Sequence, residues 1–309
     1  MPLRPLIHPG FHKTGTSWLQ ANLFANSAHF DSFFTHEQAD LLFCRPHDLE
    51  FDAEATRAAC RARLVQVSGR IPVLSSEILS GLIFTGSTIS AAVAKRLRSS
   101  FDDAKILFTV RAQVPMVRSI YSQYIKRGGR LSLEEFLDYK PEYGYSWFNR
   151  DVVRFDRLVA FYADLFGADN VLVLPQELLA RDQDAFCNLV IRYASDGAID
   201  THPQIVARNE GVSPPASGTA LIRAGNLFHH GPCNPNALRS GALVGKALRS
   251  LGYRWTPGND RAKATMDRVI RTWLGNDHRA GNAALQRWCP VDLQQLGYAF
   301  PEPGLPAHR

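Results

Sequence analysis

The sequence predicts an α/β fold of three layers, in which helices cover both faces of a central parallel sheet. Short apolar runs that suit buried strands recur along the chain, and each is followed by a polar or turn residue. They cover residues 3–8, 71–74, 106–110 and 171–174. Amphipathic helical stretches separate these runs, and such alternation is typical of a parallel sheet that is covered on both faces.

The stretches between the strands have the apolar spacing of helices. They run over about 15–24, 53–67, 89–99, 115–126, 149–166, 183–194, 216–227 and 261–274. Pro115 suits the first residue of its helix, where a missing N–H costs nothing. Residues 231–259 are rich in Gly, Pro and Asn, so we expect them to form a covering loop or lid.

The composition restricts the classes of protein to which the chain can belong. The chain has 309 residues, of which 45% are hydrophobic and 21% charged. These values are ordinary for a globular protein and exclude the collagen-like, coiled-coil and disordered classes. No internal repeat or low-complexity linker divides the sequence. We therefore expect a single domain over 1–309, in which 231–309 is a loop-rich C-terminal portion.

Cysteine usage and hydropathy favour a cytoplasmic protein. The five cysteines are scattered and lie in no metal-binding spacing, which indicates reduced thiols. The N-terminus has no signal-peptide core, and no stretch approaches the roughly 18 to 20 apolar residues that span a bilayer. The expected localisation is cytoplasmic, with no membrane span.

The loop after the first strand has the composition of a phosphate site. Residues 8–19 read His-Pro-Gly-Phe-His-Lys-Thr-Gly-Thr-Ser-Trp-Leu, so glycines, hydroxyls and one lysine precede a helix. Backbone N–H groups and the helix dipole favour an anion there. The Walker A pattern G-x-x-x-x-G-K-[ST] is nearly met by Gly10 and Gly15, but its lysine is displaced to Lys13 inside the loop. The alternative is a Gly/Thr turn without a ligand.

A second candidate site follows the third predicted strand. Arg111 comes directly after residues 106–110, at the sheet edge where parallel sheets bind ligands, and Ser119 falls about one turn into the next helix. A guanidinium and a hydroxyl suit a phosphate that is bound but not transferred. Residues 105–130 contain no acidic side chain and carry a net charge of +6. The alternative is that Arg111 pairs with a carboxylate and Ser119 only packs.

Together the two loops resemble the sulfotransferase family that uses 3′-phosphoadenosine 5′-phosphosulfate (PAPS). The first loop is similar to the family's 5′-phosphosulfate loop, P-K-[ST]-G-T-[ST]-x-L, with His12 in place of the usual proline. The second is similar to its 3′-phosphate motif, an arginine followed eight residues later by a serine. Segments 75–77, 121–128 and 208–213 also look like bacterial members. The resemblance covers roughly residues 1–230 and implies a P-loop-like nucleotide-binding fold.

The resemblance implies roles for individual residues. Lys13 would be catalytic and would neutralise charge on the leaving adenosine 3′,5′-bisphosphate. The further cofactor-binding residues would be Thr14, Gly15, Thr16, Ser17, Trp18, Arg111, Ser119, Arg208 and Asn209. Trp18 would stack on the adenine, although packing under the sheet is the competing interpretation. The family's later arginine-lysine-glycine motif is not visible. No metal is needed.

The acceptor must lose a proton, so a general base is expected near the sulfur. Glu77 is our choice because it follows the second predicted strand in a Ser-Ser-Glu context where related members place a catalytic carboxylate. Its alternative is an N-cap or surface glutamate. Many cytosolic members use a histidine, so His8, His12 and His36 are held in reserve.

The leading hypothesis is thus a PAPS-dependent sulfotransferase that acts on a hydroxyl, with an amine as second choice, of a small-molecule or carbohydrate acceptor. One alternative is a P-loop kinase or nucleotide hydrolase. Such an enzyme would need a lysine directly after Gly15, and this sequence has none there. Another is a non-catalytic nucleotide- or polyanion-binding module. The basic and aromatic residues of 121–130 accompany no nucleic-acid-binding motif, so no nucleic-acid partner is expected. We expect acceptor specificity to reside in 28–70 and 231–259.

Overall fold

The computed structural model describes residues 4–67, 69–143, 145–199 and 213–302. Its contacts divide the chain into two compact units. The first contains residues up to Ala112, 144–210 and 276–309, and the second contains 113–143 and 211–275. That the whole chain 1–309 forms one domain stays a prediction.

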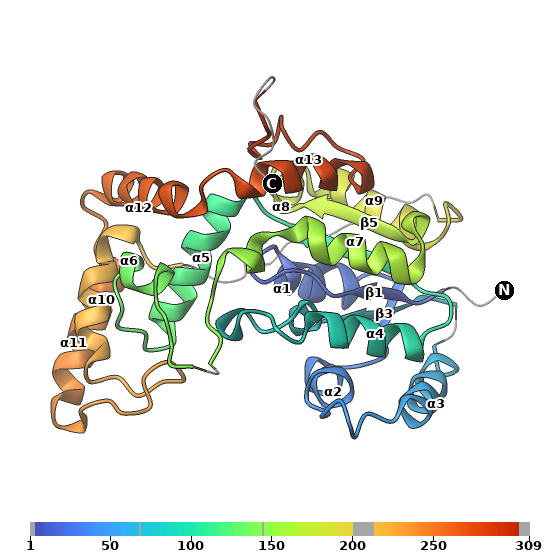
Figure 1. Ribbon diagram of the computed structural model, residues 1–309, viewed down its shortest axis with the longest axis horizontal. Coiled ribbons are helices and arrows are strands. Elements are labelled where there is room, and N and C mark those ends of the chain that lie inside the picture. Colours follow the sequence, from blue (N-terminus) through green and yellow to red (C-terminus); the bar gives the residue numbers. More distant parts are fainter. Residues whose placement is uncertain (1–3, 68, 144, 200–212, 303–309) are drawn as a thin grey trace. The chain divides into compact units, whose positions relative to one another are not determined.

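The first unit is built on a parallel sheet of five strands (Figure 1). They are β1 (Leu6–His8), β2 (Phe30–Ser32), β3 (Ile71–Ser75), β4 (Lys105–Val110) and β5 (Val171–Pro175), in the order β2-β3-β1-β4-β5. All four ladders are parallel, with Leu6 opposite Val73 on one side and Lys105 on the other. The predicted fold class is therefore confirmed, as are the four predicted strands.

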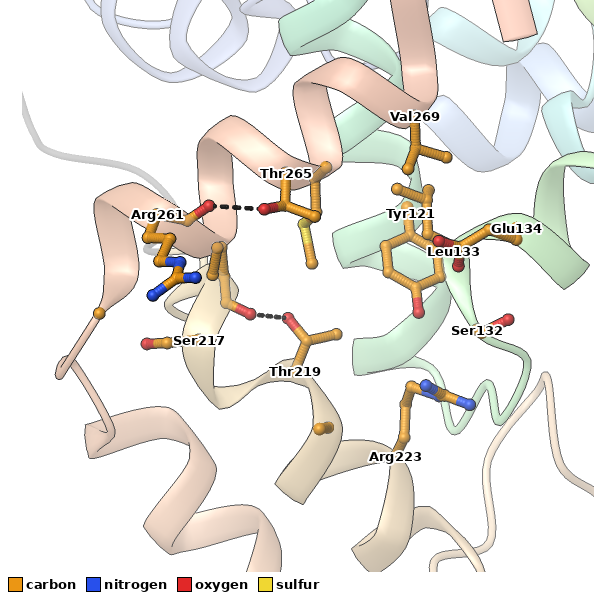
Figure 2. A pocket seen from close by; sticks show the side chains of 15 residues that line it. Tyr121, Ser132, Leu133, Glu134, Ser217, Thr219, Arg223, Arg261, Thr265 and Val269 are labelled. Atoms are coloured by element: carbon orange, nitrogen blue, oxygen red, sulfur yellow. Dashed lines mark hydrogen bonds between the residues drawn. The ribbon is translucent and has the colours of Figure 1, made fainter. Parts of the chain in front are cut away.

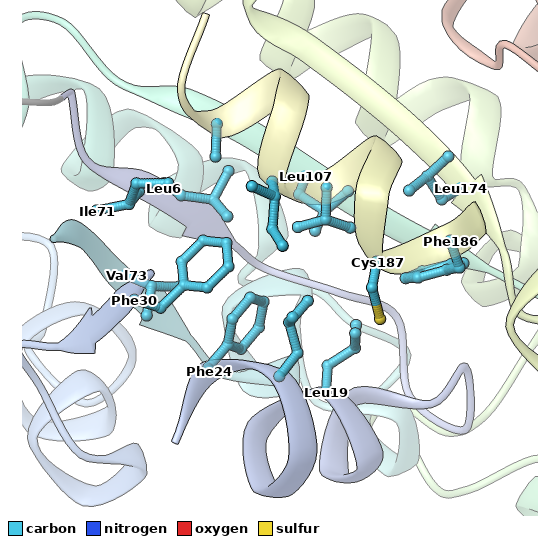
Figure 3. Packing of buried hydrophobic residues seen from close by; sticks show 14 of the residues in the cluster. Leu6, Leu19, Phe24, Phe30, Ile71, Val73, Leu107, Leu174, Phe186 and Cys187 are labelled. Atoms are coloured by element: carbon cyan, nitrogen blue, oxygen red, sulfur yellow. The ribbon is translucent and has the colours of Figure 1, made fainter. Parts of the chain in front are cut away.

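Helices cover both faces of this sheet, which explains why β3 and β4 are buried along their whole length. On one face, Leu107 and its neighbours pack with α1 (Thr16–Trp18), the π-helical turns Leu19–Phe24 that continue it, and α9 (Gln183–Ala194). Figure 3 shows Leu19, Phe24, Phe186 and Cys187 meeting there.

On the other face, α4 (Ser90–Ser100) and α7 (Phe155–Phe166) pack against the strands (Figure 1). The side chain after Leu107 points to this face, and the rings of Phe108 and Tyr162 lie 5.0 Å apart, edge to face. Arg98 of α4 donates a hydrogen bond to the carbonyl of Leu165 at 2.9 Å and so ties α4 to α7.

The remaining helical segments of the first unit connect or border these layers. The α-helices are α2 (His36–Ala39), α3 (Ala53–Leu64), α8 (Gln176–Arg181) and α13 (Asp277–Leu285). A π-helical segment covers Asp40–Cys44, and 3₁₀ turns cover Glu77–Ser80, Ile83–Thr85, Arg150–Val153, Ala168–Asn170 and Gln286–Trp288.

The second unit is helical. It contains α5 (Gln113–Lys126), α6 (Leu133–Leu137), α10 (Thr219–Asn226), α11 (Ala242–Arg254) and α12 (Asn259–Leu274), with 3₁₀ turns at Ala216–Gly218 and Arg239–Gly241. The buried amide of Asn226 donates to the carbonyls of Ile125 and Gly129, which joins α10 to α5. The indole N–H of Trp273 donates to the carbonyl of Leu137 and joins α12 to α6.

Two sequence interpretations of the C-terminal part are wrong. The segment 231–259 is not a loop throughout, because α11 occupies 242–254. The described part of 231–309, residues 231–302, is largely helical through α11, α12 and α13. Two of the glycines that suggested a loop, Gly245 and Gly252, pack between helices. A Cβ on Gly245 would lie 2.9 Å from the carbonyl oxygen of Gly225, and one on Gly252 would lie 2.7 Å from that of Gly218. Helices α10 and α11 approach so closely that no side chain fits between them.

Candidate functional site

The candidate site lies at the carboxyl edge of the sheet, between β1 and β4. From β1 the chain proceeds to β2 and β3 on one side, whereas β4 leads to β5 on the other. The strand order reverses at this point, and open α/β sheets bind ligands in the crevice that such a reversal creates. The loop 9–15 leaves β1 here, and Arg111 follows β4 directly.

Three residues of the loop have left-handed backbone conformations. Gly10 has φ +56°, Lys13 has φ +67° and Gly15 has φ +95°. A Cβ on Gly10 would lie only 2.8 Å from the hydroxyl oxygen of Thr16, so the position admits only glycine. Lys13 carries a side chain in a conformation that costs roughly 1–2 kcal/mol. Strain of this kind is typical of a residue kept for its chemistry.

A chain of buried hydrogen bonds holds the loop to the sheet. Thr14 donates its hydroxyl hydrogen to the carbonyl of Phe11 at 2.5 Å, so Thr109 is the donor in the 2.8 Å contact between the two threonine hydroxyls. His8 Nε2, 3.1 Å from Thr109 Oγ1, then donates to that hydroxyl, and His8 Nδ1 accepts from Ser75 Oγ at 2.8 Å. Every donor in this chain is used once.

His8 is neutral in this network. Its side chain is 0% exposed, and burial lowers the pKa of its ring to about 3. Both ring nitrogens already have partners in the protein. These contacts argue for a structural role, so His8 is a poor choice of general base.

The start of the first helix supplies an unsatisfied hydroxyl. Thr16 is 4% exposed, and its Oγ1 has no hydrogen-bond partner among the residues that the structure describes. A buried hydroxyl without a partner is costly, and a ligand oxygen at this site would satisfy it. Ser17 is exposed at the helix start, whereas Trp18 is half-buried and packs against the hydrophobic cluster below the sheet.

Arg111 lies beside the loop. Its Nη1 donates to the carbonyl of Lys13 at 3.3 Å, and burial lowers the pKa of its guanidinium. Within the described residues no carboxylate lies at ion-pair distance from this side chain, which leaves donors for an anion. Ser119, the predicted partner of Arg111, is half-buried on α5 in the second unit, so their joint action stays a prediction.

Two residues at this edge were not predicted. Glu177, just after β5, accepts hydrogen bonds from the backbone N–H of Ala112 and from the hydroxyl of Tyr298, both at 3.0 Å. Burial and the carboxylate of Glu177 raise the pKa of Tyr298 well above its ordinary value. Glu177 thereby fixes the backbone next to Arg111. Its signal in the sequence was a polar pair, Gln176 and Glu177, directly after a buried apolar run.

Candidate bases gather on the other side of the loop. Glu77 begins the 3₁₀ turn after β3 and is half-buried. Its charge acts on the ring of His12, and the charges of Lys13 and His36 act on the same ring. His12 donates from Nε2 to the carbonyl of Gly81 at 2.8 Å, and burial lowers its pKa. The first unit therefore brings these four side chains close together.

Some expectations are not tested by the geometry. Arg208 and Asn209 lie outside the described residues. Within the described part of the chain, no three His, Cys, Asp or Glu side chains form a group that could hold a metal ion. The same residues contain no helix with the length and apolar character needed to cross a bilayer.

Comparisons with known proteins find similarity among solved structures. No family model and no curated protein matches the chain. The crystal structure of a sulfotransferase from Alicyclobacillus acidocaldarius matches it with a TM-score of 0.49 and 20% sequence identity, over 82% of this chain and 99% of that one.

Proposed function

We propose that this protein is a sulfotransferase that moves a sulfuryl group from PAPS to a hydroxyl of a small-molecule or carbohydrate acceptor, with an amine as the second choice of acceptor group. The observation that carries the proposal is the contact between Arg111 and the loop apex. The guanidinium of Arg111 donates to the backbone carbonyl of Lys13 at 3.3 Å. Among the described residues, no carboxylate lies at ion-pair distance from this guanidinium. Arg111, the first residue of the second motif, thus adjoins the loop that resembles the family's 5′-phosphosulfate motif.

The residues present fit the donor molecule. The hydroxyl of Thr16 is buried without a described partner beside Gly10, where a Cβ would come within 2.8 Å of it. Across the loop, Gly15 faces α8, where a Cβ would lie 3.2 Å from Leu179. A glycine-lined cradle with an orphaned hydroxyl suits the oxygens of a phosphate.

When bound, PAPS would supply the sulfuryl group that passes to the acceptor. Lys13 would hold its ammonium at the loop apex and neutralise negative charge that develops on the leaving side. Gly15, Thr16 and Ser17 would bind the 5′-phosphate, and Arg111 with Ser119 would bind the 3′-phosphate. Trp18, Arg208 and Asn209 would complete the contacts to the nucleotide.

Glu77 would take the proton from the acceptor. In the described structure its carboxylate accepts no hydrogen bond and forms no ion pair, so it is not committed to a structural role. His12 and His36 are the alternative bases, since the charges of Glu77 and His36 both act on the ring of His12. Transfer would require no metal.

The test is a calorimetric titration of the full chain with adenosine 3′,5′-bisphosphate and, separately, with ATP·Mg²⁺. We expect the bisphosphate to bind more tightly and to raise the free energy of unfolding by about 2.7 kcal/mol at a concentration of 100 Kd. Preference for ATP·Mg²⁺ would favour the kinase alternative, and binding of neither nucleotide would refute both.

A second experiment separates an enzyme from a binding module. Purified protein is incubated with PAPS and a panel of phenols, alcohols, sugars and amines, and sulfated products are detected by mass spectrometry. Products from hydroxyl acceptors are expected. Tight bisphosphate binding without any product would instead support the non-catalytic module.

A further inference from the structure

The second unit contains a pocket that the proposed sulfuryl transfer does not use (Figure 2). Its volume is about 410 Å³, within the range of small-molecule sites. Its walls come from α5, the start of α6, the first turns of α10 and the first half of α12. All lining residues belong to the second unit.

One wall of the pocket is apolar and rigid. It contains Tyr121, Leu133, Met266 and Val269, and Figure 2 shows the ring of Tyr121 next to Val269. The hydroxyl of Tyr121 donates to the carbonyl of Leu131 at 3.0 Å, so the ring is held in place. A flat apolar group would pack well against this surface.

The hydroxyl groups of the pocket bond within the protein. Ser217 donates to the carbonyl of Trp255 at 2.7 Å, and Thr219 donates to that of Ala216 at 2.8 Å. Thr265 donates to the carbonyl of Arg261 at 2.9 Å. The hydroxyl hydrogens are thus used, and the donors left for a ligand are mainly on guanidinium groups.

Two arginines border the pocket on different sides. Arg223 donates from Nε to the carbonyl of Arg130 at 3.0 Å and lies 3.9 Å from the carboxylate of Glu135. Arg261 is exposed and, among the described residues, makes no side-chain hydrogen bond or ion pair. Figure 2 shows its guanidinium above Ser217, on the side away from Arg223. Glu134 is the acidic lining residue, so positive charge predominates.

The first turn of α12 brings a helix N-terminus to the pocket, and of its two charged residues Arg261 lines the pocket whereas Asp260 does not. Gly258, with φ +68°, is the N-cap of this 16-residue helix, and no side chain caps it. Gly258, Arg261 and Ala262 all line the pocket, so the start of the helix lies at its border; the N–H of Ala262 donates to the carbonyl of Gly258, and no side chain caps the N–H of Arg261. The positive end of a helix dipole favours an anion.

The pocket lies on a different face of α5 from the proposed 3′-phosphate residue. Successive residues of an α-helix turn by about 100°, so Tyr121 points about 200° away from Ser119. A ligand against Tyr121 therefore does not occupy the site assigned to Ser119. The pocket constitutes a second site, independent of whether the chain transfers sulfate.

We propose that this pocket binds an aromatic organic anion. Its carboxylate or sulfate group is bound by Arg261 and the first turn of α12. Its ring packs against Tyr121, Leu133, Met266 and Val269.

The test uses the full chain and three probes of the same ring system: 2-naphthyl sulfate, 2-naphthoate and the neutral 2-naphthol. Each is titrated by calorimetry with and without saturating adenosine 3′,5′-bisphosphate. We expect both anions to bind at least ten-fold more tightly than the naphthol, whether or not the bisphosphate is present. The stronger of the two anions identifies the preferred head group.

Matched variants locate the binding. Arg261→Gln should weaken both anions about ten-fold and leave the naphthol unchanged, since the exposed side chain has no described partner whose loss would unfold the protein. Arg268→Gln, exposed on the same helix but outside the lining, should change neither. Equal affinity for all three probes, wild-type affinity in Arg261→Gln, or displacement of the anions by the bisphosphate would overturn the proposal.

Discussion

The ring of His8 and the hydroxyl of Thr109 join the ends of β1 and β4 by a hydrogen bond of 3.1 Å. Thr109 in turn donates to the hydroxyl of Thr14, which donates to the carbonyl of Phe11 in the loop 9–15. The conformation of the loop therefore depends on a neutral imidazole beneath it.

This dependence predicts that acid destabilises the protein through His8. Its pKa is about 3 in the folded state and near 6.5 when unfolded, so the unfolded chain binds the proton first. The contribution of neutral His8 to the free energy of unfolding is complete above pH 6.5. As the pH falls from 6.5 toward 3, this contribution decreases by about 1.4 kcal/mol per pH unit. Denaturation with urea should show that His8 lowers the free energy of unfolding by about 3 kcal/mol at pH 4.5 relative to pH 6.5. His8→Gln should lack this part of the pH dependence; parallel curves for the two proteins would contradict it.

The orphaned hydroxyl of Thr16 predicts opposite effects on stability and binding. Thr16→Val removes a buried polar group that has no described partner, so the free energy of unfolding should rise by about 1 kcal/mol. Affinity for adenosine 3′,5′-bisphosphate should fall about ten-fold, because a hydrogen bond to the phosphate is lost. Thermal unfolding and calorimetry measure the two quantities.

Thr14→Val is the matched control. This hydroxyl has partners in Phe11 and Thr109, so its removal should lower the free energy of unfolding by about 1–3 kcal/mol. Equal stability changes in the two variants would show that the hydroxyl of Thr16 does not differ from that of Thr14.

The left-handed backbone of Lys13 predicts that its side chain is kept at the expense of stability. Lys13→Ala and Lys13→Gly should both reduce sulfate transfer by at least about 100-fold, since charge stabilisation at the loop apex is lost. The glycine variant should be more stable than the alanine variant by about 1 kcal/mol, because only glycine adopts φ +67° freely.

Lys95→Ala, at an exposed position of α4, should leave transfer unchanged. Wild-type transfer by Lys13→Ala would remove this lysine from the mechanism.

The base assignment predicts a separation of turnover from binding. Glu77→Gln should lower kcat by about 100-fold or more, whereas affinity for the bisphosphate changes less than about two-fold, since the carboxylate acts on the acceptor. Glu37→Gln, on an exposed position of α2, is the control. Full turnover by Glu77→Gln together with loss in His12→Gln would assign the base to His12.

The sequence predicted the sheet well because its strands are buried runs with clear ends. It missed β2, which has three residues of which Phe30 alone is buried, so neither an apolar run nor an alternation marks it. It missed α11 because Gly245 and Gly252 have low helix propensity. These glycines let α11 pack closely against the backbone at α10, and that contact is visible only in the structure.

The site was predictable where a motif is continuous in sequence. Lys13, Thr16 and Arg111 follow strand ends that the apolar pattern located, and the structure places these three in one unit. The contact of Glu177 with Tyr298 joins residues 121 positions apart, so no local pattern could indicate it. The expected pairing of Arg111 with Ser119 stays a prediction.

The central position of β1 has a consequence for when the loop 9–15 can reach its folded conformation. Leu6 pairs with Val73 and with Lys105, so β1 has no complete set of neighbours until about a hundred further residues have been synthesised. Contacts between such distant segments form late in folding. A nascent or truncated chain that ends before β4 would therefore contain Lys13 and its glycines without the folded loop 9–15, and these residues of the proposed site would be among the last to reach their final conformation.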